Sequence, residues 1–574
     1  MKHLRPTHRV ALAAFLSLGP ALAGWAQERE PEREPEGLFV DTISARTVNV
    51  DVYVTDPEGQ PVRGLRKEDF QLFEDGRPVA ISNFYAVEEG APAAPSAVAV
   101  DGGEPPAEEA PAEVLAAGAA EALPSDQRLR LVLYVDNRHI APFHRTRVIR
   151  QLLDFLYDVT AAGDEIMLVS YDGGVRIEEQ FSDDVRSLSR RLLELTERSG
   201  ASTGFAGERQ EILRAIEDAD SSVEVAGRIR AEARSLQSDL RFTVGALRDT
   251  VHSLAGLPGR KAVVYVSDGL PMVPGRDLFY AVQNRFSDFS ALSGAMEFDL
   301  AQEFRELANV ANSNRVSFIT VDASGLELDG SIRAEHGGGK FDNDMRTAVA
   351  SVDRANRQDS IRLLAAQTGG VAVLGSNDVR PRLASAVGSL RTYYSLGFQP
   401  SGSGDGRYHR LEVRVARGGV VVRHREGYRD KSPTVRMAEK VEASLRFDVG
   451  DDPLGLRLDV GAPVAREDSR YLLPVTVRIP LGGVTLLPRG ELYVGRLTLF
   501  FSAIDPDGGI SPVGTEPLTL EIPAADYPDA LGKTWTYEAQ LLVRPGRQRV
   551  AVAVRDDLGG AEAIVGRTVT VDDV

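Results

Sequence analysis

Two hydrophobic patterns alternate through the middle of the chain. Continuous apolar runs such as Leu129–Val135 and Ala262–Val266 are typical of strands that are buried on both faces of a sheet. Between them, stretches such as Arg147–Tyr157 carry apolar residues three or four positions apart, which predicts amphipathic helices. The alternation predicts an α/β domain over residues 128–430, with a doubly wound, mostly parallel, Rossmann-like sheet and helices on both faces.

The other elements of this domain follow from the same two patterns. Residues 183–258 are helical in pattern almost throughout, which is more than one crossover between parallel strands needs, and the pattern leaves their role open. Thr392–Phe398, Tyr408–Val415 and Val420–His424 predict an antiparallel extension of the domain. Further strands are expected at Glu165–Tyr171, Val175–Phe181, Val316–Val321 and Gly370–Leu374, and further helices at Leu300–Ala311, Ser360–Gln367 and Val379–Leu390.

Both flanks of the α/β domain have strand patterns. Residues 38–87 alternate apolar and polar positions between turn signals such as Asp56-Pro57-Glu58-Gly59, which predicts a small β domain. Residues 431–574 show no convincing helix, so we expect an all-β sandwich of the immunoglobulin or fibronectin kind. Its strands are expected at Ala443–Val449, Leu472–Ile479, Tyr493–Ile504, Leu518–Ile522, Trp535–Val543, Gln548–Val554 and Ile564–Val571.

The N-terminus has the features of a secretory signal peptide. A basic segment, Met1–Arg9, precedes the apolar stretch Val10–Ala23, which ends in Ala21-Leu22-Ala23. The alternative is a membrane anchor, but this stretch is shorter than the roughly 20 residues that span a bilayer. We therefore expect cleavage of a signal peptide at residues 1–26 and export, to the periplasm or the outside of a bacterial cell, with no membrane span afterwards.

Two stretches lack the composition of folded protein. Residues 27–37 alternate Glu, Arg and Pro, and we expect them to be disordered. Residues 88–127 form an Ala/Pro/Glu segment that holds nine acidic residues and no Lys or Arg. Such a segment cannot bury enough apolar surface to offset the entropy of ordering, so it reads as an acidic linker; an acidic interaction tail is the alternative.

Composition narrows the functional classes. The chain of 574 residues has 66 basic and 84 acidic side chains, a net charge of −18, which argues against general affinity for nucleic acid or anionic lipid. It contains no cysteine, which excludes disulfides, thiolate metal sites, a cysteine nucleophile and a lipid-modified N-terminal cysteine. An exported protein of this kind depends on its hydrophobic cores for stability.

Polar residues gather where two buried strands end. Tyr134-Val135-Asp136-Asn137-Arg138-His139-Ile140 spans the end of one strand, and Val266-Ser267-Asp268-Gly269 the end of another. With Phe70–Gly76, Tyr393–Phe398 and Arg423–Tyr428, these segments resemble the von Willebrand factor type A (VWFA) domain, and more closely a secreted VWFA-related group first described in acidobacteria. The resemblance covers residues 38–428.

The resemblance implies a binding site at the carboxyl edge of the sheet. Domains of this family usually hold a divalent cation in a metal-ion-dependent adhesion site, built from an Asp-x-Ser-x-Ser loop, a distant Thr and a distant Asp, with one coordination position left for a partner's carboxylate. Asp136 matches the first Asp, Asp268 the last, and Thr203 is the best candidate for the Thr. If a metal such as Mg²⁺ binds, these three residues are its expected ligands.

The sequence departs from the family at the two serines. Arg138 and Ile140 occupy their positions, so both hydroxyl ligands are lost and a permanent positive charge stands near the place of the ion. We therefore expect a degenerate site in which Arg138 pairs with Asp136 and Asp268 and replaces the cation, so that no resident cofactor is needed. Asn137 and His139, at the intervening positions, are expected to point elsewhere.

Other catalytic and metal-binding patterns are weak. His139 and His144 are not at the spacing of a helical zinc pair, and we interpret them as polar loop residues. Gly337-Gly338-Gly339-Lys340 lacks the first glycine and the final Ser or Thr of a phosphate-binding loop, and a mobile insertion is the better interpretation. The acidic pairs Asp505/Asp507 and Asp556/Asp557 could ligate Ca²⁺, but they are typical of turns without any ion.

The sequence thus predicts an exported, non-enzymatic, adhesion-type binding protein. The edge formed by Asp136, Arg138, Thr203 and Asp268 would meet a protein or another cell-envelope ligand. The alternative is a structural envelope scaffold whose β domains make the contacts. An enzyme is the third reading, but no cluster combines a nucleophile, a base and an orienting group.

Overall fold

The structure, a computed structural model, describes residues 47–88, 91–92, 129–160, 164–198, 202–326, 341–402, 404–466 and 470–572. The chain divides into two compact units, one built from Thr47–Leu254 and Pro258–Asp430 and the other from Lys431–Val574 with a short piece at Ala255–Leu257. The predicted signal peptide at 1–26, the segment 27–37, nearly all of the predicted linker and the Gly337–Lys340 loop lie outside the described residues.

A six-stranded sheet forms the centre of the first unit. Its strand order is β11-β10-β9-β6-β7-β8, and all neighbours are parallel except β7 and β8, which form an antiparallel pair at one edge. The predicted strands are confirmed, and the α/β class with them. The strands are β6 (Leu129–Val135), β7 (Glu165–Tyr171), β8 (Val175–Ser182), β9 (Arg260–Ser267), β10 (Val316–Asp322) and β11 (Val371–Val373).

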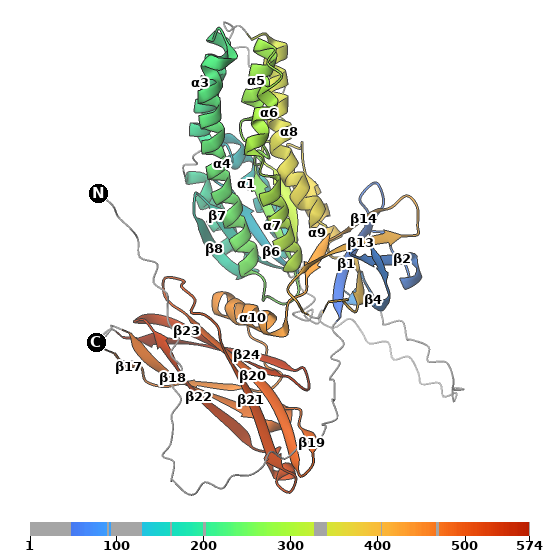
Figure 1. Ribbon diagram of the computed structural model, residues 1–574, viewed down its shortest axis with the longest axis vertical. Helices are drawn as coiled ribbons and strands as arrows, with labels where there is room; N and C mark the ends of the chain where they lie inside the picture. The colour runs from blue at the N-terminus through green and yellow to red at the C-terminus, as the bar shows by residue number, and fades with distance from the viewer. Residues whose placement is uncertain are drawn as a thin grey trace, which may run out of the picture. The chain divides into compact units, whose positions relative to one another are not determined.

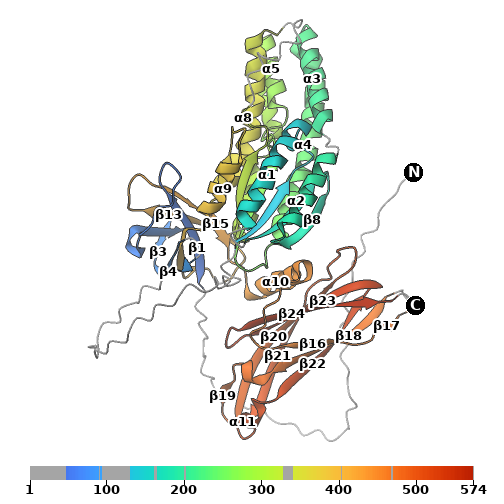
Figure 2. The same ribbon diagram turned by 180° about the vertical axis from the view of Figure 1, so that it is seen from behind.

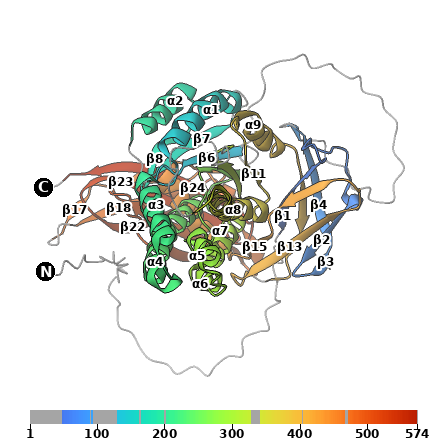
Figure 3. The same cartoon turned by 90° about the horizontal axis from the view of Figure 1, so that it is seen from above.

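Helices cover both faces of this sheet, as Figure 3 shows. On one face lie α1 (Pro142–Thr160), α2 (Val185–Glu194) and α9 (Arg380–Ser389), whose apolar stripes share one core with the strands. On the other face lie α4 (Ser222–Ser253), α7 (Ala301–Ser313) and α8 (Asn343–Gln367). Helices on both faces explain why the strands are apolar without alternation: β6 and β9 are buried along their whole length.

The long helical stretch has a structural role that the sequence left open. Helix α3 (Ser202–Asp218) and the first half of α4 pack with α5 (Arg276–Phe286), α6 (Ala291–Ala295) and the start of α8 into a helical bundle with its own core (Figures 1 and 2). The second half of α4 extends beyond the bundle and covers one face of the six-stranded sheet. None of the helices in the described part of the chain combines the length and the apolar character needed to cross a membrane.

The strands predicted at 38–87 do not form a domain of their own. They pair with strands of the predicted antiparallel extension in two sheets around one core: β14-β1-β12-β4-β5 and β15-β13-β2-β3. The sequence separated them because their pairing is long-range and leaves no local pattern. The strands are β1 (Val48–Thr55), β2 (Phe70–Glu74), β3 (Arg77–Val79), β4 (Ile81–Glu88), β5 (Ala91–Pro92), β12 (Tyr393–Phe398), β13 (Tyr408–Val415), β14 (Val421–His424) and β15 (Gly427–Arg429).

The second unit consists of two antiparallel sheets around a common core, with a long helix and a short one that the sequence analysis did not predict. Residues predicted as a strand at Ala443–Val449 belong largely to α10 (Pro433–Phe447). The Ser432 side chain accepts the Val435 N–H, and Met437, Val441 and Leu445 recur every fourth residue on the buried side, which is a helical and not a strand period.

The six other predicted strands of this unit are present, and short strands at Arg457–Val460, Val464–Ala465 and Leu487–Arg489 were not predicted. One sheet contains β16 (Arg457–Val460), β17 (Val464–Ala465), β18 (Tyr471–Pro480) and β22 (Thr534–Val543). The other contains β19 (Leu487–Arg489), β20 (Leu492–Ile504), β21 (Gly514–Pro523), β23 (Gly546–Asp556) and β24 (Glu562–Val571), and a short helix, α11 (Tyr527–Ala530), lies between β21 and β22.

A truncation tests the shared β sheets of the first unit. Strand β12 is buried along its whole length between β1 and β4, so a chain of residues 128–430 would expose both of its edges. We expect residues 47–430 to unfold cooperatively on heating and residues 128–430 to aggregate or to melt without a sharp transition. An equally sharp transition in the shorter chain would mean that 47–87 is a separate domain after all.

Candidate functional site

The predicted site lies at the switch point of the six-stranded sheet. Strands β6 and β9 are central neighbours, with Val135 opposite Val266, and the chain after each strand leaves in a different direction. In open α/β sheets such a point leaves a crevice at the carboxyl ends of the strands, where ligands bind. Asp136 directly follows β6 and Asp268 directly follows β9, so the sequence placed both carboxylates correctly.

The carboxylate of Asp136 is fully buried and surrounded by donors. It accepts hydrogen bonds from the Tyr265 hydroxyl (2.6 Å), the Ser267 hydroxyl (3.3 Å) and the backbone N–H of His139 (3.2 Å). The Nδ1 atom of His139 lies 3.0 Å from each carboxylate oxygen. Because a carboxylate accepts about four hydrogen bonds, protein donors use the whole capacity of Asp136.

His139 joins Asp136 to a second carboxylate that the sequence analysis missed. Its Nε2 atom lies 3.3 Å from Asp239 Oδ2, on helix α4. Burial opposes the charged form of the ring, but the two carboxylates outweigh burial and raise the pKa of His139 to about 9. The ring is therefore an imidazolium at neutral pH, and both of its nitrogens donate.

Arg138 is held by the same helix residue. Its Nε lies 3.2 Å from Asp239 Oδ2, and its Nη2 bonds Asp239 Oδ1, so the guanidinium meets the carboxylate in a two-pronged arrangement. Burial favours the neutral acid, but His139 and Arg138 outweigh it and lower the pKa of Asp239 to about 2. The bidentate partner of Arg138 is thus Asp239, and not the pair Asp136 and Asp268 that the sequence suggested.

Asp268 has a different role, at the start of helix α1. One of its oxygens, Oδ2, accepts the backbone N–H of Ala141 (2.9 Å) and lies 2.8 Å from His144 Nδ1. A carboxylate at this place satisfies N–H groups that the first helical turn leaves without partners. Gly269 follows with a φ of 87°, and a Cβ there would stand 2.7 Å from the Arg357 carbonyl oxygen, so the turn after β9 requires glycine.

The loop after β6 corrects one expectation. Asn137 and His139 were expected to point away from the site. The Asn137 side chain does so, since it bonds Asp172 through Nδ2 and accepts a hydrogen bond of 2.6 Å from Arg145, but His139 is part of the site. The expectation assumed that side chains alternate as in a strand. Here the His139 N–H donates to the Asp136 carbonyl oxygen (3.2 Å), so the loop is a tight turn in which the alternation ends.

Two further expectations concern Thr203 and the histidines. Thr203 lies in the first turn of α3, and its side chain falls outside the described residues, so its proposed ligand role stays a prediction. His139 and His144 are not ordinary polar loop residues, because each bonds one of the strand-end carboxylates, Asp136 and Asp268.

The residues of this site do not fit a divalent cation. Arg138 and fully buried Ile140 replace the two hydroxyl ligands, and the cationic ring of His139 uses the acceptor capacity of Asp136. Asp268 Oδ1 is buried without a hydrogen-bond partner in the described structure, but one carboxylate oxygen is too little to hold Mg²⁺. Within the described residues no group of three or more His, Asp or Glu side chains is arranged to hold a metal ion.

In the second unit, two of the acidic turn residues accept hydrogen bonds from backbone N–H groups of their own turns. Asp505 accepts the Gly509 N–H (2.7 Å) and pairs with Arg544, while Asp556 accepts the N–H groups of Leu558 and Gly559 (both 2.9 Å). The interpretation as turn formers is therefore supported for Asp505 and Asp556.

The sequence signals for the missed residues are weak. Asp239 lies 101 residues after Arg138, on a helix whose buried stripe includes Leu240, Thr243 and Val244. An acidic residue beside a buried stripe is the only local sign that it has a cationic partner, and the partner cannot be identified from spacing. Tyr265 reads as an ordinary member of a buried strand, although its hydroxyl bonds Asp136.

Comparisons with known proteins leave the family open. No family model and no curated protein matches the chain. Among solved structures, it is similar to BatB from Bacteroides thetaiotaomicron (10% identity, TM-score 0.20) and to an aerotolerance-related membrane protein from Bacteroides fragilis (9%, TM-score 0.22). Each similarity covers 46% of this chain and 98% of the other. A third similar structure is the pilus adhesin SpaC from Lactobacillus rhamnosus GG, at 10% identity and a TM-score of 0.17. This similarity covers 77% of this chain and 52% of the adhesin chain. Scores this low support no functional inference.

The charge on His139 makes the stability of the first unit depend on pH. The folded pKa of about 9 lies above the ordinary value of 6.5, so the stabilisation is complete below about pH 6.5 and is lost as the pH rises through 9. At about 1.4 kcal/mol per pKa unit, the loss is a few kcal/mol. We expect denaturant unfolding, followed by far-ultraviolet circular dichroism, to show this fall in the wild type and not in His139→Gln. The matched control is His252→Gln, at an exposed position, which should keep the wild-type profile.

Metal binding is tested by calorimetry. Titration of the purified chain with Mg²⁺, Mn²⁺ or Ca²⁺ should give little heat, because the donors of the protein already use the acceptor capacity of Asp136. Binding at micromolar concentration, abolished in Asp136→Asn, would contradict this description of the site.

Proposed function

We propose that the chain is an exported, non-enzymatic binding protein with a VWFA-like domain, whose carboxyl sheet edge binds an acidic group of a protein or another envelope partner without a metal ion. The observation that carries the proposal is the pair of cations at this edge: Arg138 and His139 both bond to the single carboxylate of Asp239. Two positive charges directed at one carboxylate have the charge and geometry needed to recognise an acidic ligand.

In this proposal, Asp239 stands in for the acidic group of the partner. The resemblance to VWFA domains implies a cation that meets the carboxylate of a partner. Here a guanidinium and an imidazolium supply the positive charge, and Asp239 satisfies them in the absence of a partner. Binding is then an exchange of one carboxylate for another, so the affinity for a partner is reduced by the internal competitor.

The exposed fractions of the side chains support an exchange of carboxylates at the ion pair between Arg138 and Asp239. Asp136 is fully buried, whereas 24% of the Arg138 side chain and 20% of the Asp239 side chain are exposed. Two aromatic side chains lie close along the chain: Phe143, next to His144, is 76% exposed, and Phe242, one helical turn after Asp239, is 73% exposed. Exposed aromatic residues are enriched in protein interfaces, so these two are expected at the rim of the contact.

A catalytic role is not part of the proposal. A general base needs a free acceptor within reach of a substrate, but near neutral pH both nitrogens of His139 donate to carboxylates. Asp239 is ionised and occupied by Arg138 and His139, and Asp136 is enclosed. These groups hold charges in place, which suits recognition better than proton transfer.

Two substitutions with opposite effects test the proposal. Asp239→Asn removes most of the internal competitor and should tighten partner binding by about fivefold or more. Arg138→Ala removes the bidentate donor and should weaken binding by about tenfold or more. The partner is captured from a native envelope extract on the immobilised chain and quantified by titration of the extract. Binding should be unchanged by a chelator, and Phe289→Ala, at another exposed aromatic residue, serves as the control.

The scaffold alternative makes a different prediction for the second unit. This unit has its own core and two sheets, so it can be deleted without removing a strand of the six-stranded sheet. If deletion of residues 432–574 abolishes all capture while Arg138→Ala and Asp239→Asn have no effect, the contacts are made by the β-sandwich. Retained capture that still responds to Arg138→Ala supports the sheet edge.

A further inference from the structure

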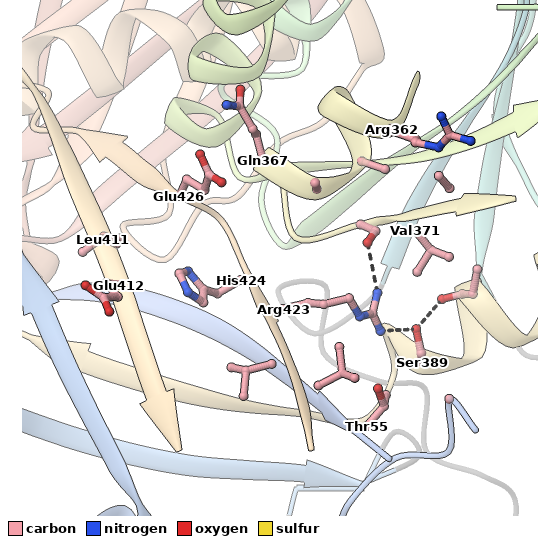
Figure 4. A pocket seen from close by; sticks show the side chains of 18 of the residues that line it. Thr55, Arg362, Gln367, Val371, Ser389, Leu411, Glu412, Arg423, His424 and Glu426 are labelled. Carbon is pink, nitrogen blue, oxygen red and sulfur yellow. Dashed lines mark hydrogen bonds between the residues drawn. The ribbon is translucent and has the colours of Figure 1, made fainter. Parts of the chain in front are cut away.

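A groove separate from the switch point lies inside the first unit. It has a volume of about 1800 Å³ and lies between the edge strand β11 of the six-stranded sheet and the edge strand β14 of the five-stranded sheet (Figure 4). Helices α7, α8 and α9, strand β13, the end of β1 with the turn that follows it, and the turn between β2 and β3 supply the rest of its lining. Pockets for small molecules usually measure about 300–1,000 Å³, so this groove has room for a polypeptide segment. None of Asp136, Arg138, Asp239 or Asp268 lines it.

Both strands present an unpaired edge to the groove. Among the described strands, β11 pairs with β10 and β14 pairs with β1, each on one side only. The Val54 carbonyl oxygen accepts the Val62 N–H (2.8 Å), so Val54 directs its backbone groups away from β14. Because Val422 lies opposite Val54 in an antiparallel pair, Val422 must direct its own N–H and C=O away from β1, toward the groove. Such an edge is a template for one more strand.

The two edges are joined at one end, which fixes their spacing. The Glu426 N–H donates to the Gln367 carbonyl oxygen (3.1 Å), and Arg423 donates to the Gly370 carbonyl oxygen (3.3 Å) and to Ser389 Oγ (2.8 Å). Figure 4 shows the Arg423 guanidinium between β14 and the segment that leads into β11. Gly369 has a φ of 71°, and a Cβ there would lie 2.7 Å from the His424 carbonyl carbon, so glycine permits this close junction. The groove is therefore built into the fold.

The charge of the lining favours an acidic occupant. Exposed side chains of Arg305 on α7 and Arg410 on β13 make no hydrogen bond or ion pair within the described part of the chain. Two of the acidic residues in the lining are already engaged, since Glu412 pairs with Arg414 (2.6 Å) and Asp75 bonds the Arg410 N–H (2.8 Å). Exposed Arg362, which pairs with Asp359 (3.5 Å), and exposed Arg382 also line the groove, as do the acidic residues Asp56 and Glu426. The lining therefore holds five arginines and four acidic residues.

We propose that this groove binds an extended acidic peptide of a partner protein, which adds a strand to β14 between β14 and β11. The backbone groups at Val422 would supply the ladder hydrogen bonds, and Arg305 and Arg410 would meet alternate acidic side chains of the peptide. This is β-strand addition with charge selection, and it is independent of the carboxylate exchange proposed for the sheet edge.

Three labelled peptides of equal length separate the two parts of the proposal. Fluorescence anisotropy of the full-length chain is measured with alternating Val-Glu, alternating Val-Lys and alternating Pro-Glu peptides. Val-Lys reverses the charge, and Pro-Glu keeps the charge but has fewer N–H donors for a ladder. We expect Val-Glu to bind about tenfold tighter than either. Absence of Val-Glu binding overturns the proposal, and equal binding of Val-Glu and Pro-Glu overturns strand addition.

Substitutions then place the peptide in the groove. Arg410→Glu should weaken Val-Glu binding about tenfold or more, whereas Arg190→Glu, a charge reversal at an exposed position of α2 outside the groove, should change it by less than about twofold. Val422→Pro removes the N–H that faces the groove, and edge strands tolerate proline where the N–H serves no ladder; Val422→Ala is its matched control. Of these two variants, we expect Val422→Pro to lose Val-Glu binding and Val422→Ala to keep it.

Two further outcomes bear on the groove proposal: a Val422→Pro variant that does not fold, and binding of the peptide at the sheet edge. If Val422→Pro fails to fold in a thermal melt, the Arg410→Glu result and the comparison of Val-Glu with Pro-Glu decide the proposal without it. If Arg138→Ala abolishes Val-Glu binding and Arg410→Glu does not, the peptide binds at the sheet edge and the groove proposal is wrong.

Discussion

A carboxylate without access to water, at the carboxyl end of the central strand β6, is the constraint on which the site depends. Asp136 is fully buried, and an unpaired buried charge would cost several kcal/mol. The fold meets this cost with two hydroxyls, one backbone N–H and the cationic ring of His139. The other nitrogen of that ring needs an acceptor, Asp239 supplies it, and α4 is thereby placed over the carboxyl edge of the sheet.

In the proposed function, this arrangement changes the conditions on which binding depends. A metal-bearing VWFA site depends on the supply of a divalent cation, whereas a site that carries its own cations depends on proton concentration and on competing carboxylates. Arg138 keeps its charge at all ordinary pH values, and His139 keeps its charge up to about pH 9. In the groove between β14 and β11, Arg305 and Arg410 make no ion pair within the described part of the chain. Both features suit acidic partners, although the chain itself carries a net charge of −18.

Local patterns in the sequence predicted the individual strands and helices whose formation depends on nearby residues. Buried parallel strands such as Leu129–Val135 and helices such as α7 follow from continuous or periodic apolar residues. The sequence did not show that residues 47–88 complete sheets with residues 393–429, because those strands meet only through long-range pairing. Helix α10 was missed because its short apolar runs were read as a strand, although Met437, Val441 and Leu445 have helical spacing.

The candidate site was predicted in position but not in pairing. Asp136 and Asp268 follow from strand ends, while Asp239 is separated from Arg138 by 101 residues and has no motif. The most direct test of the central claim is an NMR titration of His139 in the full-length chain, with labelled histidine and assignment by His139→Gln. We expect the His139 ring to titrate near pH 9 and its signal to be unaffected by Mg²⁺. A ring that titrates near 6.5, or whose signal shifts when Mg²⁺ is added, would contradict the claim that protein cations replace the metal.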